Sequence, residues 1–153
     1  MITWWCFFMQ EDKKIEIIEN FEIEREDGRV FAHKYIGQDI DIVIPEEITD
    51  IKYEAFAAYG EKKQYRSLYI NSKIKEPIRD NCFENFYVDE NNPYMCSVDG
   101  VLYSKDKKKL LHYPSLSKRE VYYVLDSVEE IHFPAFRYCS LVELILNDGL
   151  KKN

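Results

Sequence analysis

The chain has 153 residues, of which 46% are hydrophobic and 32% charged, and its net charge is −7 at pH 7. Its length suits one ordinary domain with a single core, and it lacks the run of about 18 apolar residues needed to span a bilayer. The acidic balance argues against nucleic-acid binding, because contact with phosphates needs clustered lysine and arginine. We therefore expect a soluble protein with no nucleic-acid partner and no membrane insertion.

Residues 1–20 are expected to form an N-terminal segment outside the repeat described below. Their apolar start, residues 2–9, has no basic residue before it and no small-residue cleavage site after it, so it does not resemble a secretory signal. This predicts a cytoplasmic protein, with the cell surface or secretion as the alternative if a leader is missing. Residues 13–20 fit a short helix and a strand equally well.

Two Asp-Gly pairs, at 27–28 and 99–100, each lie between alternating apolar stretches. Asp-Gly is typical of a tight hairpin turn whose central residues need positive φ. Residues 21–39 are therefore predicted to form a capping hairpin, and residues 87–121 a strand with a hairpin insertion. The lysine cluster at 105–109 is predicted to be a turn of that insertion.

Three segments, 42–56, 68–83 and 122–136, share one order of apolar residues. Each begins with an apolar-x-apolar triplet, continues through further Ile or Val, and ends in a small residue followed by phenylalanine. A fourth copy starts at Leu144 and is incomplete. Val124 and Leu146 are 22 positions apart, within the roughly 20–29 expected of leucine-rich repeats.

The period of two in each triplet sends its outer side chains into a core and its middle side chain to the opposite face. The phenylalanines that end the segments, Phe56, Phe83 and Phe136, are expected to stack as a buried aromatic column. Phe136 is therefore predicted to be fully buried against Phe83 or its neighbours. One coil cannot bury its own apolar side, so neighbouring coils must stack.

Residues 88–114 resemble the insertion of BspA-like leucine-rich repeats, and residues 128–136 resemble the turn-and-phenylalanine segment of that family. The resemblance implies a curved solenoid used for protein–protein contact, often at cell surfaces, with no catalytic residues. The fold predicted is a leucine-rich-repeat solenoid of short parallel β-strands with irregular or short helical backs and β-hairpin insertions. Its predicted organisation over residues 21–153 is a capping hairpin at 21–39, repeats at 40–86, a strand and hairpin insertion at 87–121, and further repeats at 122–153.

The middle residues of the triplets are the candidate binding site on the concave face: Val43, Tyr69, Tyr87, Tyr123 and Ile145. Tyrosine is enriched where proteins bind partners, so three adjacent tyrosines would form a ladder roughly 10 Å long that anchors a peptide or loop. The alternative is that aromatic and β-branched residues simply favour strands, where cross-strand pairs stabilise a sheet. The sequence leaves both interpretations open.

The sequence predicts no catalytic residues, no metal site and no cofactor. The three histidines have no second histidine at metal-ligand spacing, and the four cysteines, Cys6 among them, fall in no zinc pattern. The leading hypothesis is a protein-interaction module with a protein or peptide partner. A fragment of a bacterial surface adhesin is one alternative, and a small hydrolase using Cys139 and His132 is another.

Self-association is also expected. The last coil lacks its phenylalanine segment, so Leu144, Leu146 and Leu150 should be partly uncovered in a lone molecule. The apolar N-terminal segment contains Trp4, Trp5, Phe7 and Phe8. The sequence therefore predicts a homodimer through this segment or the uncapped C-terminal end, or a swapped N-terminal segment.

Overall fold

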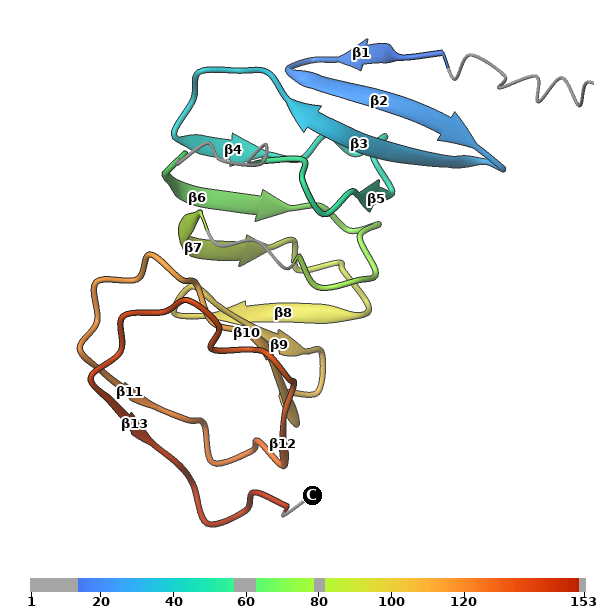
Figure 1. Ribbon diagram of the computed structural model, residues 1–153. Coiled ribbons are helices and arrows are strands. Elements are labelled where there is room, and N and C mark those ends of the chain that lie inside the picture. The colour runs from blue at the N-terminus through green and yellow to red at the C-terminus, as the bar shows by residue number, and fades with distance from the viewer. Residues whose placement is uncertain (1–13, 57–62, 79–81, 152–153) are drawn as a thin grey trace, which may run out of the picture.

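The computed structural model describes residues 14–56, 63–78 and 82–151, which form a solenoid of short strands. Within these ranges there is no helix, and successive coils stack on one another from the N-terminal hairpin to the C-terminal end (Figure 1). The predicted leucine-rich-repeat solenoid is confirmed, and the described parts of its backs are irregular rather than helical.

The strands that open the coils lie side by side in two groups. They are β4 (Asp41–Val43), β6 (Tyr65–Ile70), β7 (Phe83–Val88), β11 (Val121–Tyr123) and β13 (Glu143–Ile145). The first three pair in parallel as one sheet, and the last two pair in parallel as another. β7 spans the boundary predicted after residue 86, so the strand and the preceding repeat are continuous.

The expected alternation of buried and exposed side chains holds in most of these strands. Ile42 and Ile44 are buried around the exposed Val43, and Tyr122 and Val124 are buried around the exposed Tyr123. The last coil is looser. There Leu144 and Ile145 are both half-buried and Leu146 is 55% exposed, as is expected where no further described coil covers it.

Antiparallel strands form two three-stranded meanders. The first consists of β1 (Glu16–Ile18), β2 (Phe21–Glu26) and β3 (Arg29–Tyr35), and the second of β8 (Met95–Val98), β9 (Val101–Ser104) and β10 (Lys109–His112). A short strand of the following coil extends each meander in parallel: β5 (Asp50–Ile51) pairs with β3, and β12 (Glu130–Ile131) pairs with β10. The ambiguity at residues 13–20 is thereby resolved in favour of a strand.

Both Asp-Gly pairs form the predicted turns. Asp27 and Gly28 have φ angles of 49° and 76°, and Asp99 and Gly100 have 49° and 79°. Positive φ at both central positions defines the tight turn whose twist matches that of paired strands. The predicted insertion hairpin is therefore correct, and it gains β8 as a third strand.

The two meanders and the coils that follow them repeat one layout. The sheet orders β1-β2-β3-β5 and β8-β9-β10-β12 correspond strand for strand. The last residue of each meander also makes the same contact: Tyr35 N donates to Ala55 O at 2.7 Å, and Tyr113 N donates to Ala135 O at 2.9 Å. The chain is thus built from two related halves, each a meander followed by stacked coils.

The halves join where the turn of the second meander meets β7. Phe86 N donates to Gly100 O at 2.9 Å, and Val88 N donates to Ser97 Oγ at 3.0 Å. A Cβ atom on Gly100 would lie 2.5 Å from Asn85 Oδ1, so this approach needs glycine for space as well as for its φ.

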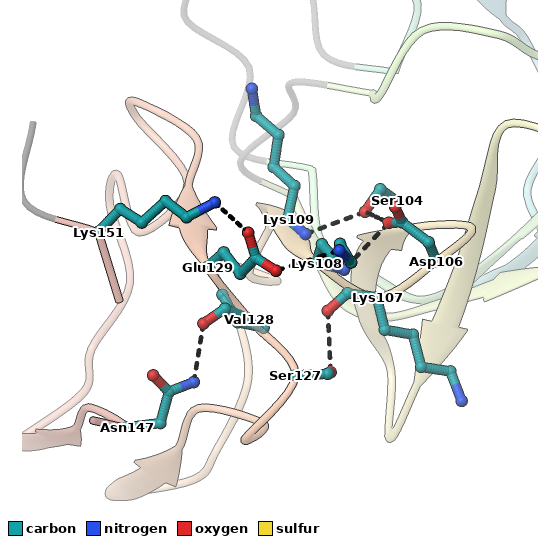
Figure 2. A network of polar contacts seen from close by, with 10 residues as sticks. All are labelled: Ser104, Asp106, Lys107, Lys108, Lys109, Ser127, Val128, Glu129, Asn147 and Lys151. Carbon is teal, nitrogen blue, oxygen red and sulfur yellow. Dashed lines mark hydrogen bonds and ion pairs between the residues drawn. The ribbon is translucent and has the colours of Figure 1, made fainter. Parts of the chain in front are cut away.

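Lysines in the predicted turn between β9 and β10 pair with the next coil. Lys108 Nζ lies 3.1 Å from Glu129 Oε1, Lys151 contacts the other oxygen of Glu129, and Ser127 Oγ donates to Lys107 O at 2.9 Å (Figure 2). Lys109 pairs with Glu130 at 2.7 Å. These lysines therefore fix the turn against the coil rather than forming a free basic patch.

Buried asparagines link successive coils. Asn71 Nδ2 donates to Pro45 O at 2.6 Å and to Ile48 O at 3.0 Å, while its Oδ1 accepts from Lys73 N and Ile74 N. One amide thus satisfies carbonyls of the preceding coil and N–H groups of its own turn.

The same arrangement recurs further along the chain. Asn92 bonds the Asn71 and Ile74 carbonyls, and Asn147 bonds those of Leu125 and Val128, the latter at 3.0 Å (Figure 2). These contacts fix the spacing of consecutive coils.

The aromatic core is divided, contrary to the predicted single column. Phe56 and Phe83 do contact each other edge to face, with ring centroids 5.0 Å apart. Phe136 belongs to a second cluster and stacks on Tyr113 at 5.3 Å. It is half-buried rather than fully buried, because the second meander separates its coil from that of Phe83. The prediction that Phe136 is fully buried against Phe83 or its neighbours is therefore wrong.

Candidate functional site

The middle residues of the coil strands point away from the core, as predicted, with one exception. The exposed fractions are 61% for Val43, 43% for Tyr69, 40% for Tyr87 and 69% for Tyr123. Ile145 is half-buried. The alternation of the strands therefore places four of the five candidate side chains at the surface.

Three of these side chains form one continuous surface. Val43, Tyr69 and Tyr87 are level with one another on the parallel strands β4, β6 and β7. The rings of Tyr69 and Tyr87 stack with centroids 5.0 Å apart and planes inclined by 23°. We call the surface formed by these three residues the tyrosine face.

Tyr123 is not part of the tyrosine face, so the predicted ladder of three adjacent tyrosines is wrong. Its strand β11 pairs with β13, where Tyr123 is level with Ile145. The sheet that contains β8, β9 and β10 lies between β7 and β11 (Figure 1). The five candidate residues thus fall into two groups on two sheets.

A shallow hollow of about 200 Å³ runs along the tyrosine face. Its polar rim comes from the turns that follow the three strands and includes Glu46, Asn71 and Asp89. Ser72 Oγ donates to Glu46 at 3.2 Å, and Asp89 Oδ1 accepts from Asn91 N at 2.8 Å. The surface therefore combines an aromatic floor with oriented carboxylates that can accept hydrogen bonds.

The rim residues were missed by the sequence analysis. Glu46 and Asp89 lie one or two positions beyond the triplets of their coils. Because the coils stack in register, residues just after each triplet converge at the same edge of the sheet. Comparing those positions between repeats would have found them.

The arrangement of cysteines and histidines gives no support to the hypothesis of a Cys139–His132 hydrolase. The Cys139 thiol donates to the Phe136 carbonyl oxygen at 3.0 Å rather than to an imidazole. His33 Nε2 lies 2.5 Å from a carboxylate oxygen of the buried Glu24, and His112 packs against Phe86. Cys82 is buried and forms no disulfide within the described residues, and Cys6 lies outside them.

The described residues contain no group of three or more His, Cys, Asp or Glu side chains arranged to hold a metal ion. In the same part of the chain, no helix has the length and apolar character required to traverse a bilayer.

The fold defines the class of protein as a leucine-rich-repeat solenoid. A leucine-rich repeat protein from Eubacterium ventriosum ATCC 27560 is similar in structure, with a TM-score of 0.59, 20% identity, and coverage of 72% of this chain and 30% of that one. The pneumococcal vaccine antigen PcpA is also similar, with a TM-score of 0.52, 24% identity, and coverage of 74% and 31%. The chain thus spans about a third of the length of these proteins. No family model and no curated protein sequence matches it.

Proposed function

We propose that this chain is a non-catalytic protein-interaction module of the leucine-rich-repeat type, and that its tyrosine face binds a protein or peptide. The observation that carries the proposal is the stacked pair of Tyr69 and Tyr87, whose rings are ordered against each other yet remain exposed. Tyrosine and other aromatic residues dominate the energetics of many interfaces.

The stacking favours binding for a physical reason. A mobile side chain loses rotamer freedom when a partner orders it, at a cost of roughly 0.5–1.5 kcal/mol. The two tyrosines already restrict each other, so less of this cost remains at the moment of binding. Their hydroxyl groups can also donate and accept hydrogen bonds at the edge of an apolar contact.

The dimensions of the tyrosine face suit one segment of a partner. Neighbouring strands are about 4.8 Å apart, so the distance from Val43 across Tyr69 to Tyr87 is roughly 10 Å. This span is enough for a short extended peptide or a loop. The carboxylates of Glu46 and Asp89 at the rim favour a partner that brings N–H or cationic groups to this edge.

A pull-down with the intact protein tests the proposal. The double variant Tyr69→Ser/Tyr87→Ser should lose the captured partner while its thermal melt stays close to that of the parent. The matched control Tyr123→Ser/Tyr138→Ser also removes two exposed tyrosines, but from other surfaces, and should retain the partner. Equal capture by both double variants would refute the proposal.

A fragment of a BspA-like surface adhesin is the second candidate. It is supported by the similarity of the chain to about a third of PcpA, a vaccine antigen. Pull-downs from the cell extract and from host extracellular matrix separate the two candidates, because an adhesin should capture its partner from the matrix alone.

A further inference from the structure

A groove runs along a different side of the solenoid, on which β5 and the turn between β2 and β3 lie (right side of Figure 1). It consists of two hollows of about 300 and 660 Å³. Both are lined by Arg29, Thr49 and Asp50, so they adjoin each other. Tyr53 borders the first hollow and Tyr94 borders the second.

Positive charges outnumber negative charges among the residues that line this groove. Lys52 borders the first hollow, and Lys73 and Lys75 border the second. Within the described part of the chain none of these three ammonium groups forms an ion pair with a carboxylate. Arg29 does pair with Asp50, with its Nε 2.9 Å from Oδ2. Since Glu76 is the other lining carboxylate, the groove is net positive on a chain whose net charge is −7.

Aromatic rings hold several of these cations in place. The Arg29 guanidinium lies 4.8 Å and the Lys52 ammonium 4.3 Å from the centroid of the Phe31 ring. Lys75 Nζ lies 5.6 Å from the centroid of Tyr94. Cation–π contacts of this kind position a charge without neutralising it. The cations therefore remain available to an anionic ligand.

The first hollow has an apolar lining. Ile51 contributes to it from β5, and Ile74 and Ile78 contribute from the next coil. β5 is also the outermost strand of its sheet, in the order β1-β2-β3-β5. An edge strand presents backbone groups that can pair with an added strand.

We propose that this groove binds an acidic peptide segment in an extended conformation, with apolar side chains between its carboxylates. The carboxylates would lie against Lys52, Lys73 and Lys75, and the apolar side chains against the isoleucines. A sulfated polysaccharide would satisfy the lysines but would leave the apolar lining of the first hollow uncovered, so the groove favours the peptide. The site is separate from the tyrosine face and does not depend on it.

Fluorescence anisotropy of the intact protein tests this proposal. The probe is a fluorescein-labelled synthetic peptide in which aspartate and leucine alternate, and heparin serves as the polysaccharide competitor. The peptide should bind, and Lys73→Glu/Lys75→Glu should weaken binding by about tenfold or more, because reversed charges repel the carboxylates. The control Lys14→Glu/Lys107→Glu changes the net charge equally outside the groove and should leave the affinity within about twofold.

Three results would overturn the proposal. The first is the absence of peptide binding by the parent protein at low ionic strength. The second is an equal loss of affinity in the two double variants, since this would show attraction by net charge alone. The third is that unlabelled peptide fails to displace the labelled peptide while heparin binds the same lysines. This result would assign the groove to a polysaccharide. Circular dichroism of each variant establishes that its fold is retained.

Discussion

Tyr69 and Tyr87 occupy level positions on neighbouring parallel strands, and their rings stack 5.0 Å apart at the surface. Cross-strand aromatic pairs of this kind stabilise a sheet by roughly 0.2–1 kcal/mol, which alone explains why such residues occur in strands. The stability of the sheet does not require aromatic side chains at these outward-facing positions, because the inward-facing neighbours Leu68 and Ile70 already form the core. On the basis of its exposure and its polar rim, we propose that the stack also serves as a binding surface.

Because the aromatic core is divided into two clusters, truncating two phenylalanines at equivalent repeat positions should lower the free energy of unfolding by different amounts. Phe56 is fully buried, so Phe56→Ala should cost about 3–5 kcal/mol of unfolding free energy. Phe136 is half-buried against Tyr113, so Phe136→Ala should cost roughly 1–3 kcal/mol. Urea denaturation of both variants measures the difference. A larger loss for Phe136→Ala would contradict the two-cluster core.

The asparagine contacts predict a second stability effect. Asn71→Ala removes both donors to the Pro45 and Ile48 carbonyls and leaves buried polar groups unpaired. The expected cost is about 2–4 kcal/mol. Asn91 is exposed, so Asn91→Ala should change stability by no more than about 0.5 kcal/mol. Equal thermal midpoints for the two variants would show that Asn71 does not link the coils.

Repetition in the sequence explains which features could be predicted. The triplets and the Asp-Gly pairs are local signals, because alternation and positive φ are properties of a few consecutive residues. The separation of Tyr123 from Tyr87 is not local. It depends on the second meander packing against β7 through Gly100, a tertiary contact that no spacing reveals.

The linking asparagines did leave a signal in the sequence. Asn71 and Asn147 directly follow their triplets, and Pro45 and Leu125 stand at the same position in the coils that follow a meander. At this position the two coils that follow another coil thus carry an asparagine, and the two that follow a meander do not; in the coil of β7 the position is Asp89 and Asn92 makes the contact instead. Comparing the repeats by position, rather than by apolar pattern alone, would have identified this contact.

The buried tyrosines predict a distinctive alkaline titration. Burial raises the pKa of Tyr103, and its hydrogen bond with Tyr122 raises it further; burial also raises the pKa of Tyr122. The folded-state pKa of each tyrosine exceeds the unfolded value of about 10. The stability that these groups contribute is therefore complete below about pH 10 and is lost as the pH rises.

Ultraviolet absorbance of tyrosinate and circular dichroism follow this titration together. Exposed tyrosines should ionise first, and the last should ionise only as the fold is lost. Ionisation of all 12 tyrosines in one step with the fold intact would contradict the buried pair.

Self-association remains a prediction, because residues 1–9 with their tryptophans and phenylalanines lie outside the described residues. The surfaces they were expected to cover are partly uncovered within the described chain: Leu146 is exposed, and Leu144 and Leu150 are half-buried. Light scattering of the intact chain should show a dimer, or a monomer that deletion of residues 1–9 turns into aggregates. An unchanged, monodisperse monomer after the deletion would exclude both the dimer and the swapped segment.

Site-specific photocrosslinking tests the proposed interaction surface most directly. The photoreactive residue p-benzoylphenylalanine replaces Tyr69 in one sample and Tyr123 in another, which preserves an aromatic side chain at each exposed position. If the tyrosine face binds the partner, illumination in the presence of cell extract or extracellular matrix should yield a defined adduct from position 69 and none from position 123. An adduct from position 123 alone, or equal adducts from both positions, would contradict this assignment of the binding surface.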